Sequence, residues 1–270
     1  GFSITENGGT VALNVSGTLN NGNYTLISAP DGIFGSLGAV VVTGCSQPGQ
    51  IAFLDSSSTA VTLIVANAGD ANLVWTGSAG NFWDVETTAS WTSNAVSATF
   101  VQGDSVIFNA TGAGQPVVDL QAAVFPTTVT VDATSDYTLT TTAGGRLGGA
   151  TGLTKNNTGK LTILTDNNNS GVVTINAGTV EVGDGASTAH IGDGGFVNNG
   201  SLIFNPAAAD DRTVGSISGA GSVTQTGAAV ITVDGDATYT GATTIGAGAS
   251  LGFGTGGALA AIGTPSISND

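Results

Sequence analysis

The sequence predicts an all-β chain that winds into a parallel β-helix, also called a β-solenoid. One segment occurs twice, at residues 149–180 and 219–250, and every matched position shows the same offset in numbering (219 − 149 = 70) without a gap. Runs that look like strands are short, rich in β-branched residues and separated by Gly, Asn, Asp or Ser, as expected of an all-β fold. No stretch keeps apolar residues at helical spacing.

The ungapped repeat favours a fold that grows by stacking equal units, because in a closed globule the two copies would meet different neighbours. A β-sandwich or barrel is the competing all-β architecture, and it is built from hairpins and non-equivalent strands. A β-helix instead repeats a coil of about 20 residues, so an offset of 70 is natural in it as a multiple of coils. The matched positions are Gly149 and Gly219, Leu153 and Val223, Thr154 and Thr224, Gly171 and Gly241, Thr174 and Thr244, Ile175 and Ile245, Ala177 and Ala247, and Gly178 and Gly248.

The chain divides by residue pattern into three segments, 1–72, 73–148 and 149–270. The first alternates apolar and polar residues loosely, the second carries three tryptophans, and the third holds both copies of the repeat. None of the joins has a proline-rich or charged linker, so we expect a single continuous β-solenoid over residues 1–270. Coils of a β-helix lie about 4.8 Å apart, so roughly a dozen coils would form a rod on the order of 60 Å long.

The composition is that of a folded protein with few charges. Hydrophobic residues make up 40% of the chain and charged residues only 9%, and 43 of the 270 residues are Gly. Disorder requires low hydrophobicity and high net charge, so this chain has enough apolar residues to bury a core. Solubility must then come from hydroxyl and amide side chains on the outer surface of the strands.

The net charge of −15 comes from 19 acidic residues against four basic ones. A surface of this sign repels phosphate backbones and anionic lipids, so we expect neither nucleic-acid binding nor peripheral membrane binding. The charge also keeps copies of the chain apart unless a specific contact or a divalent cation joins them. The basic residues are Arg146, Lys155, Lys160 and Arg212.

Cys45 is the only cysteine in the sequence. An intrachain disulfide and a Cys-x-x-Cys redox site are therefore excluded. We expect a buried structural or incidental thiol, with an interchain bridge or a reactive thiol as the alternative. The chain does not start with a basic and then apolar signal segment, and no apolar run approaches the length of a membrane span, so we interpret it as a mature chain or a fragment.

Residues 235–251 carry a family resemblance. Their sequence, GDATYTGATTIGAGASL, resembles the autotransporter-associated β-strand repeat, whose usual wording is close to GANTYTGGTTINAGTL. The first copy, at residues 169–180, is a weaker match because it lacks the Thr-Tyr pair. The stretch LVWTGSAGNFWDVETTASW, followed by GDSVIFN, resembles the segments that separate such repeats in very long bacterial surface proteins. The resemblance covers most of residues 73–255.

This resemblance implies a right-handed β-helical passenger that is exported through the outer membrane and displayed or released at a bacterial surface. An extracellular or outer-membrane cell-surface location follows from the same resemblance. It specifies the type of repeat and does not specify an activity.

The two ends of the sequence read as continuations of each other. Residues 197–204 follow the first copy, and at the same offset (267 − 197 = 70) the chain stops in Ile-Ser-Asn-Asp at 267–270. Appending residues 1–4, Gly-Phe-Ser-Ile, restores the pattern with a small slip. A capped solenoid has polar and irregular ends. We therefore expect one period of a longer array, or a subunit that associates end to end with its neighbours.

Residues suited to catalysis are sparse. His190 lies in Ala-His-Ile-Gly-Asp at 189–193, and we favour a turn residue over a catalytic base or metal ligand, because one histidine cannot supply a two-His metal site. Polysaccharide cleavage needs convergent carboxylates, usually with Arg or Lys, so we interpret most acidic pairs as solvated turn residues. The acidic candidates are Asp84 and Glu86, Asp104, Asp184 and Asp193, Asp210 and Asp211, and Asp234 and Asp236.

Calcium is the metal that these acids would serve best, since Asp-Gly turns offer oxygen ligands on a negative surface. The Gly-Gly-x-Gly-x-Asp calcium repeat does not occur in the sequence. Asp210 and Asp211 are the first candidates for a specific calcium site, and no other cofactor is expected.

Trp75, Trp83 and Trp91 recur at a regular interval of eight (83 − 75 and 91 − 83). Exposed aromatics at such intervals can stack on sugar rings, but we favour core packing or plugging at the end of a coil. For the Asn-x-Ser/Thr triplets we favour asparagine that points inward or stacks in ladders over glycan attachment. The triplets begin at Asn14, Asn23, Asn109, Asn156, Asn168 and Asn199.

These observations predict a non-enzymatic extracellular structural protein, a rod or filament segment at a bacterial surface. Continuous backbone ladders would resist extension and proteolysis, and a hydroxyl-rich surface would offer repeated weak contacts. An adhesin passenger that binds glycans or host surfaces is the alternative. A polysaccharide-active β-helix enzyme is a distant third.

Overall fold

The computed structural model describes residues 2–7, 10–15, 19–29, 47–56, 59–208, 210–254 and 267–269, and Cys45 lies outside these ranges. Nearly all of their regular structure is β, with a single turn of 3-10 helix, η1 (Ala110–Gly112). The chain forms two compact units, Gly1–Gly69 and Asp70–Asp270.

The first unit is antiparallel. One hairpin of two strands and one sheet of three strands are described, and alternate residues of the central strand are buried. The expected continuous solenoid over residues 1–270 needs correction here, because the described strand pairs of this unit are all antiparallel, whereas the stacked coils of a β-helix pair parallel. The hairpin is β1 (Phe2–Asn7) with β2 (Thr10–Val15), and the sheet places β5 (Ala60–Asn67) between β3 (Gly22–Ser28) and β4 (Gln50–Ser56).

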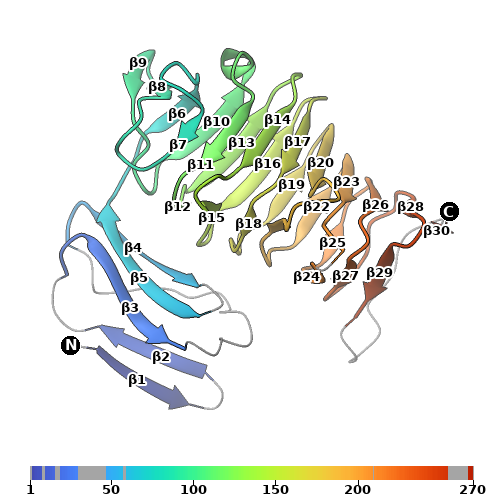
Figure 1. Ribbon diagram of the computed structural model, residues 1–270, viewed down its shortest axis with the longest axis horizontal. Helices are drawn as coiled ribbons and strands as arrows, with labels where there is room; N and C mark the ends of the chain where they lie inside the picture. Colours follow the sequence, from blue (N-terminus) through green and yellow to red (C-terminus); the bar gives the residue numbers. More distant parts are fainter. Residues whose placement is uncertain are drawn as a thin grey trace. The chain divides into compact units, whose positions relative to one another are not determined.

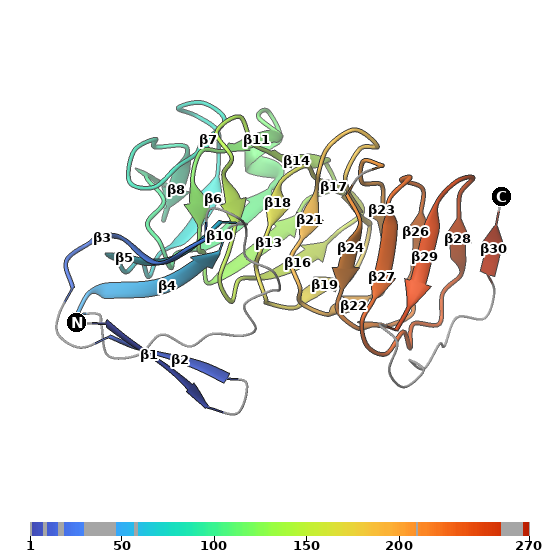
Figure 2. The same ribbon diagram turned by 60° about the horizontal axis from the view of Figure 1, so that its bottom comes forward.

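The second unit is a β-solenoid of about seven turns with parallel coils (Figures 1 and 2). A full coil contributes one strand to each of three faces, which we name A, B and C. Face A consists of β6 (Asn72–Trp75), β10 (Ser105–Asn109), β13 (Thr128–Asp132), β16 (Gly152–Asn156), β19 (Val173–Ile175), β22 (Phe196–Asn198) and β25 (Ile217–Ser218).

Face B is the longest uninterrupted parallel ladder, with nine strands. They are β7 (Phe82–Trp83), β11 (Val117–Leu120), β14 (Tyr137–Thr140), β17 (Lys160–Ile163), β20 (Thr179–Val182), β23 (Ser201–Phe204), β26 (Ser222–Gln225), β28 (Thr243–Ile245) and β30 (Ile267–Asn269). Face C is broken into three short sheets. They are β12 (Ala123–Val124) with β15 (Arg146–Leu147), β18 (Asp166–Asn167) with β21 (His190–Ile191), and β24 (Arg212–Val214) with β27 (Val230–Val233) and β29 (Ser250–Phe253).

The coil length follows from the register of face A. Val129 pairs with Leu153, Leu153 with Val173, and Val173 with Phe196, so successive coils advance the numbering by 24, 20 and 23 (153 − 129, 173 − 153 and 196 − 173). These values are close to the expected length. The expected dozen coils is too many, because residues 1–69 form the antiparallel unit and the first coil, from Leu73 to Val106, is longer, with an advance of 33 (106 − 73).

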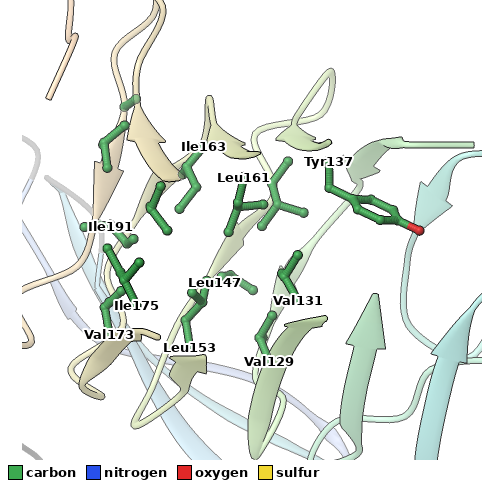
Figure 3. Packing of buried hydrophobic residues seen from close by; sticks show 14 of the residues in the cluster. Val129, Val131, Tyr137, Leu147, Leu153, Leu161, Ile163, Val173, Ile175 and Ile191 are labelled. Carbon is green, nitrogen blue, oxygen red and sulfur yellow. The ribbon is translucent and has the colours of Figure 1, made fainter. Parts of the chain in front are cut away.

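Inward side chains form columns that hold the coils in register. Val129, Leu153 and Val173 stack on face A, and Leu161 and Leu147 approach them from faces B and C (Figure 3). Burying one such side chain contributes about 1.5–3 kcal/mol. A slip of one residue would turn a whole column outward, so the alternation in the sequence fixes the pairing.

Aromatic side chains close the start of the solenoid. There β8 (Trp91–Ser93) pairs antiparallel with β6, and β9 (Val96–Ala98) pairs antiparallel with β8. Five rings pack together with centroids from 4.9 to 6.3 Å apart. The interpretation of the tryptophans as core packing at the end of a coil is confirmed. The rings, all fully buried, are Trp75, Trp83, Trp91, Phe100 and Phe108.

Candidate functional site

Charged side chains gather on face C, on three successive coils. Asp166 of β18 is the register partner of His190 of β21, and Asp210 and Arg212 lie at the start of β24 on the next coil. We call Asp166, His190, Asp210 and Arg212 the face C cluster. It combines the single histidine, the calcium candidate and one of four basic residues, so it is where chemistry would be sought first.

Arg212 joins two carboxylates in this cluster. Its Nη2 atom lies 2.6 Å from Asp210 Oδ1 and 3.0 Å from Asp166 Oδ1. The second oxygen of Asp210 accepts a hydrogen bond of 2.9 Å from the backbone N–H of Ala189. Asp210 is 5% exposed, and a buried carboxylate needs such partners to offset the loss of hydration. The cluster therefore ties coils together through charge-assisted hydrogen bonds.

Asp210 and Asp211 do not converge on a common point. Asp211 is exposed, and its Oδ1 atom accepts a hydrogen bond of 2.8 Å from the backbone N–H of Val230. Calcium takes six to eight oxygen ligands. In the described part of the chain, no group of three or more His, Cys, Asp or Glu side chains is arranged to hold a metal ion. A calcium site at these two residues would have to draw on backbone oxygens and water, and it stays a prediction.

His190 lies in a strand and is 8% exposed, so the expectation of a turn residue was wrong. Its Nδ1 atom lies 3.1 Å from the carbonyl oxygen of Asn167 on the coil before, and its Nε2 atom 3.4 Å from that of Thr213 on the coil after. The carboxylate of Asp193 is 3.9 Å from Nε2. The ring therefore bridges three coils, and both nitrogens face backbone carbonyl oxygens.

The hollow beside the cluster is apolar and leaves no room for a water molecule. Its wall includes Val182, Ile191, Phe204 and Val214 together with His190. A ligand pocket usually encloses several hundred cubic ångströms. This hollow beside the face C cluster is therefore too small for a substrate to enter.

Three of the other acidic candidates accept hydrogen bonds from backbone amides near them. Asp104 accepts bonds of 2.8 Å from the N–H groups of Ala71 and Val101, and burial raises its pKa although those amides lower it. Asp184 accepts bonds from Ala186 and Ser187, and these amides lower its pKa. Asp84 accepts a bond of 2.7 Å from the N–H of Thr88. Asp193 is exposed beside His190.

Lys155 is a buried charged residue that the sequence analysis did not single out as a candidate. It is fully buried at the corner between faces A and B, where its Nζ atom donates to the carbonyl oxygens of Asn156 at 2.6 Å and Asn157 at 2.8 Å. Burial lowers its pKa, against the opposing effects of Asp132 and Asp136. The one available signal was alternation, which places Lys155 inward, two positions after the buried Leu153.

Gln225 repeats this arrangement at the matching position of the second copy (225 − 155 = 70). It too is fully buried, and its Nε2 atom donates to the carbonyl oxygens of Gly227 at 2.9 Å and Ala229 at 2.8 Å. Corner carbonyls point away from the strand ladders, so an unpartnered one would cost about 1–3 kcal/mol. In both copies a long inward side chain supplies the missing donor.

Outward side chains form ladders of their own. Thr130, Thr154 and Thr174 are register neighbours on face A, and they are partly exposed. The amide of Asn176 donates to the side-chain oxygen of Asn156 at 2.9 Å. The expectation of ladder-stacked asparagine is confirmed at Asn156. This surface offers hydroxyl and amide groups with few charges.

Comparison with known proteins finds no family model, no curated protein and no solved structure that matches this chain. The resemblance to autotransporter-associated repeats is supported only in that the structure is a β-solenoid of about seven turns. In the described ranges, none of the helical structure is long and apolar enough to form a membrane span.

Proposed function

We propose that this chain is a non-enzymatic structural segment of an extracellular rod at a bacterial surface. The continuity of the backbone ladders carries the proposal. Face B passes through nine strands and face A through seven parallel ones, and each inner strand is hydrogen-bonded to the coil before and the coil after. Pulling such a stack apart at any level requires several hydrogen bonds and the apolar column to break together. That is the property a load-bearing or protease-resistant rod needs.

Several carboxylates are hydrogen-bonded within the chain, which supports a role without catalysis. Glycoside hydrolysis uses two carboxylates that face a substrate. Here Asp104, Asp184 and Asp210 accept backbone N–H groups, and Asp210 is also paired with Arg212. Asp119, which the sequence did not mark as a candidate, is buried and accepts hydrogen bonds from the backbone and hydroxyl of Thr142. These carboxylates stabilise the corners of the solenoid.

We also propose end-to-end association, either with a second copy or with a following coil of a longer array. Among the described strands, β29 is the last one on face C, and Leu251 and Phe253 on it are only half-buried. An edge strand of this kind presents backbone donors and acceptors that can template another strand. The charge of −15 opposes association of copies, and salt screens such repulsion.

Negative-stain electron microscopy and sedimentation of the purified chain, at low and at high salt, test this proposal. We expect particles joined end to end, and a larger fraction of them as the salt concentration rises. Particles that stay monomeric at every concentration and salt level would contradict self-association. Release of soluble oligosaccharides from a polysaccharide panel would contradict the non-enzymatic role.

An adhesin is the second candidate function, and the uncharged threonine ladder of face A favours it. Thr130, Thr154 and Thr174 present hydroxyl groups at a regular spacing of about 4.8 Å, which suits weak repeated contacts with a neutral glycan. Binding of the chain to a glycan array would support this role. A variant with Thr154→Lys and Thr174→Lys should then lose binding, whereas Thr162→Lys on β17 of face B should retain it.

Calcium at Asp210 and Asp211 is a separate proposal, tested by thermal melting with added calcium and with a chelator. A rise in Tm with calcium that Asp211→Asn abolishes would establish the site. Equal Tm values in both buffers would exclude it. Asp184→Asn, which alters an exposed turn carboxylate elsewhere, is the matched control.

A further inference from the structure

The two copies of the repeat lie on different faces of the solenoid. In the first copy, Leu153 and Val173 are register partners on β16 and β19 of face A. In the second, the matching Val223 and Thr243 are register partners on β26 and β28 of face B. Figure 2 shows the second pair of strands further along the stack than the first. The offset between the copies is therefore not a whole number of coils.

The offset equals three coils and one face. From Leu153 the register of face A passes to Val173, then to Phe196, then to Ile217, which is three coils and an advance of 64 in the numbering (217 − 153). Val223 follows Ile217 by a further six (223 − 217) and lies on the next face. The same shift moves Leu161 on face B to Ile231 on face C.

The pairing inside each copy survives this shift. Val173 follows Leu153 by the same separation along the chain as Thr243 follows Val223 (173 − 153 and 243 − 223). What the sequence repeats is therefore a stacked pair of coil segments, whichever face they occupy. This requires the corners between faces to be alike.

Two observations show that the corners are alike. Lys155 and Gln225 each donate to two corner carbonyls, and one carbonyl of each pair, that of Asn157 and that of Gly227, lies at matching positions. Glycines with positive φ recur at matching positions, where other residues would be strained. These are Gly149 (φ 65°) with Gly219 (φ 102°), and Gly178 (φ 72°) with Gly248 (φ 78°).

We propose that the repeat is a one-third-turn module, so that each further copy presents the same outward residues on the next of three faces. Thr154 and Thr174 point outward from face A, and the matching Thr224 and Thr244 from face B. A third copy places them on face C, and a fourth returns them to face A. Each copy advances the stack by about 16 Å, from three and one-third coils of about 4.8 Å.

In the rod that we propose as this protein's function, the module distributes contact residues in three directions around the axis. A rod whose repeat was a whole number of coils would instead line them up along one face. This consequence rests on the proposed rod, whereas the geometry of the module does not.

Insertion of one extra module into the full chain tests the geometry. In a Cys45→Ser background, a copy of residues 149–218 is inserted after residue 218, and Thr154 of the inserted copy is changed to Cys. The module geometry places this residue where Thr224 now lies, in register with Ile203 on face B. An in-register cysteine pair on neighbouring strands is within disulfide reach. We therefore expect Ile203→Cys to form a disulfide with it and Val197→Cys not to.

A whole-coil insertion is the matched control. A copy of residues 153–216 inserted after residue 216 adds three coils and places its Thr154, again changed to Cys, where Ser218 now lies, in register with Val197. The preference should reverse, so that Val197→Cys forms the disulfide and Ile203→Cys does not. Intact mass reads out the disulfide, and circular dichroism with a cooperative melt reads out folding.

A Val197 disulfide in the module insertion would overturn the proposal, and so would a folded whole-coil insertion beside an unfolded module insertion. If neither insertion folds, the register is tested by cysteine pairs in the chain without an insertion. There Thr224→Cys should pair with Ile203→Cys and not with Val197→Cys, and the opposite result overturns the module. The test measures register alone, so its failure and the absence of end-to-end association are separate outcomes.

Discussion

At the residue scale, the corners of the solenoid depend on buried donors. Lys155 and Gln225 differ in charge, yet each places two N–H groups on corner carbonyls inside a core that excludes water. The lysine is held by carbonyl oxygens and not by a carboxylate contact, so its burial is costly for the charged form. A backbone constraint completes this corner, since a Cβ atom at Gly178 would collide with the carbonyl oxygen of Asn157.

We predict that Lys155→Gln is tolerated and that Lys155→Met is not. Glutamine retains the donors, as the second copy shows, whereas methionine leaves two corner carbonyls without their side-chain donor and should lower the free energy of unfolding by about 1–3 kcal/mol. Urea unfolding measures both. Lys160→Met is the control, because Lys160 is a half-exposed partner of Glu181 and such pairs contribute about 0–1 kcal/mol. Equal effects of Lys155→Met and Lys155→Gln would refute the role of the donors.

Lys155 should make the free energy of unfolding depend on pH. Burial lowers its pKa below the ordinary value of 10.5, so between the folded and unfolded pKa the unfolded chain binds the extra proton. Stability then rises with pH through that window. Burial raises the pKa of Tyr137 to about 12, which acts in the opposite direction above its ordinary value of 10.0 but equally in wild type and variant.

The measurement is the difference in unfolding free energy between wild type and Lys155→Gln across the alkaline range. We expect the unfolding free energy of wild type to rise relative to that of the variant as the pH rises toward 10.5, the ordinary pKa of lysine. A difference that is constant with pH would show that Lys155 has the same pKa in both states.

At the element scale, the solenoid has one specialised end and one specialised face. The β8–β9 hairpin and five aromatic rings cover the first coil, as a terminal cap does in repeat proteins. On face C, where the strands are shortest, Arg212 and His190 join coils that few backbone hydrogen bonds connect. Side-chain contacts thus compensate for the broken ladder.

Removing a ring from the cap should be severe. Trp83→Ala deletes a fully buried ring whose centroid lies 5.2 Å from that of Trp91 and 5.4 Å from that of Phe100, and we expect a loss of about 3–5 kcal/mol in unfolding free energy. Phe82→Ala removes the neighbouring ring, which is 43% exposed, and should cost much less. Chemical unfolding followed by tryptophan fluorescence compares them. Similar losses would mean that the rings are not the cap's main support.

Two adjacent aspartates on face C, Asp210 and Asp211, should differ in how much they contribute to stability. Asp210→Ala leaves the N–H of Ala189 without its partner and removes the closest carboxylate from Arg212, so we expect a loss of about 1–3 kcal/mol. Asp211→Ala removes one exposed hydrogen bond and should cost less. Thermal melts of both variants give the comparison, and a larger effect of Asp211→Ala would contradict the structure.

At the scale of the whole molecule, alternation and the repeat predicted the stacked coils, because inward apolar columns are a one-dimensional pattern that sequence records directly. The antiparallel unit of residues 1–69 was missed, since its strands alternate in the same way and differ only in how they connect. The offset between the copies was read as a period of coils, although three coils and one face fit it. His190 was expected in a turn and Lys155 was not singled out, because the burial of both depends on neighbouring coils.

The central claim is that coils stack in parallel register from residue 72 onward, and NMR contacts between backbone protons test it most directly. Leu153 should show the contact pattern of parallel strands with both Val129 and Val173, and Val173 also with Phe196. Antiparallel contacts at these residues, or contacts of Leu153 with residues outside the neighbouring coils, would contradict the account.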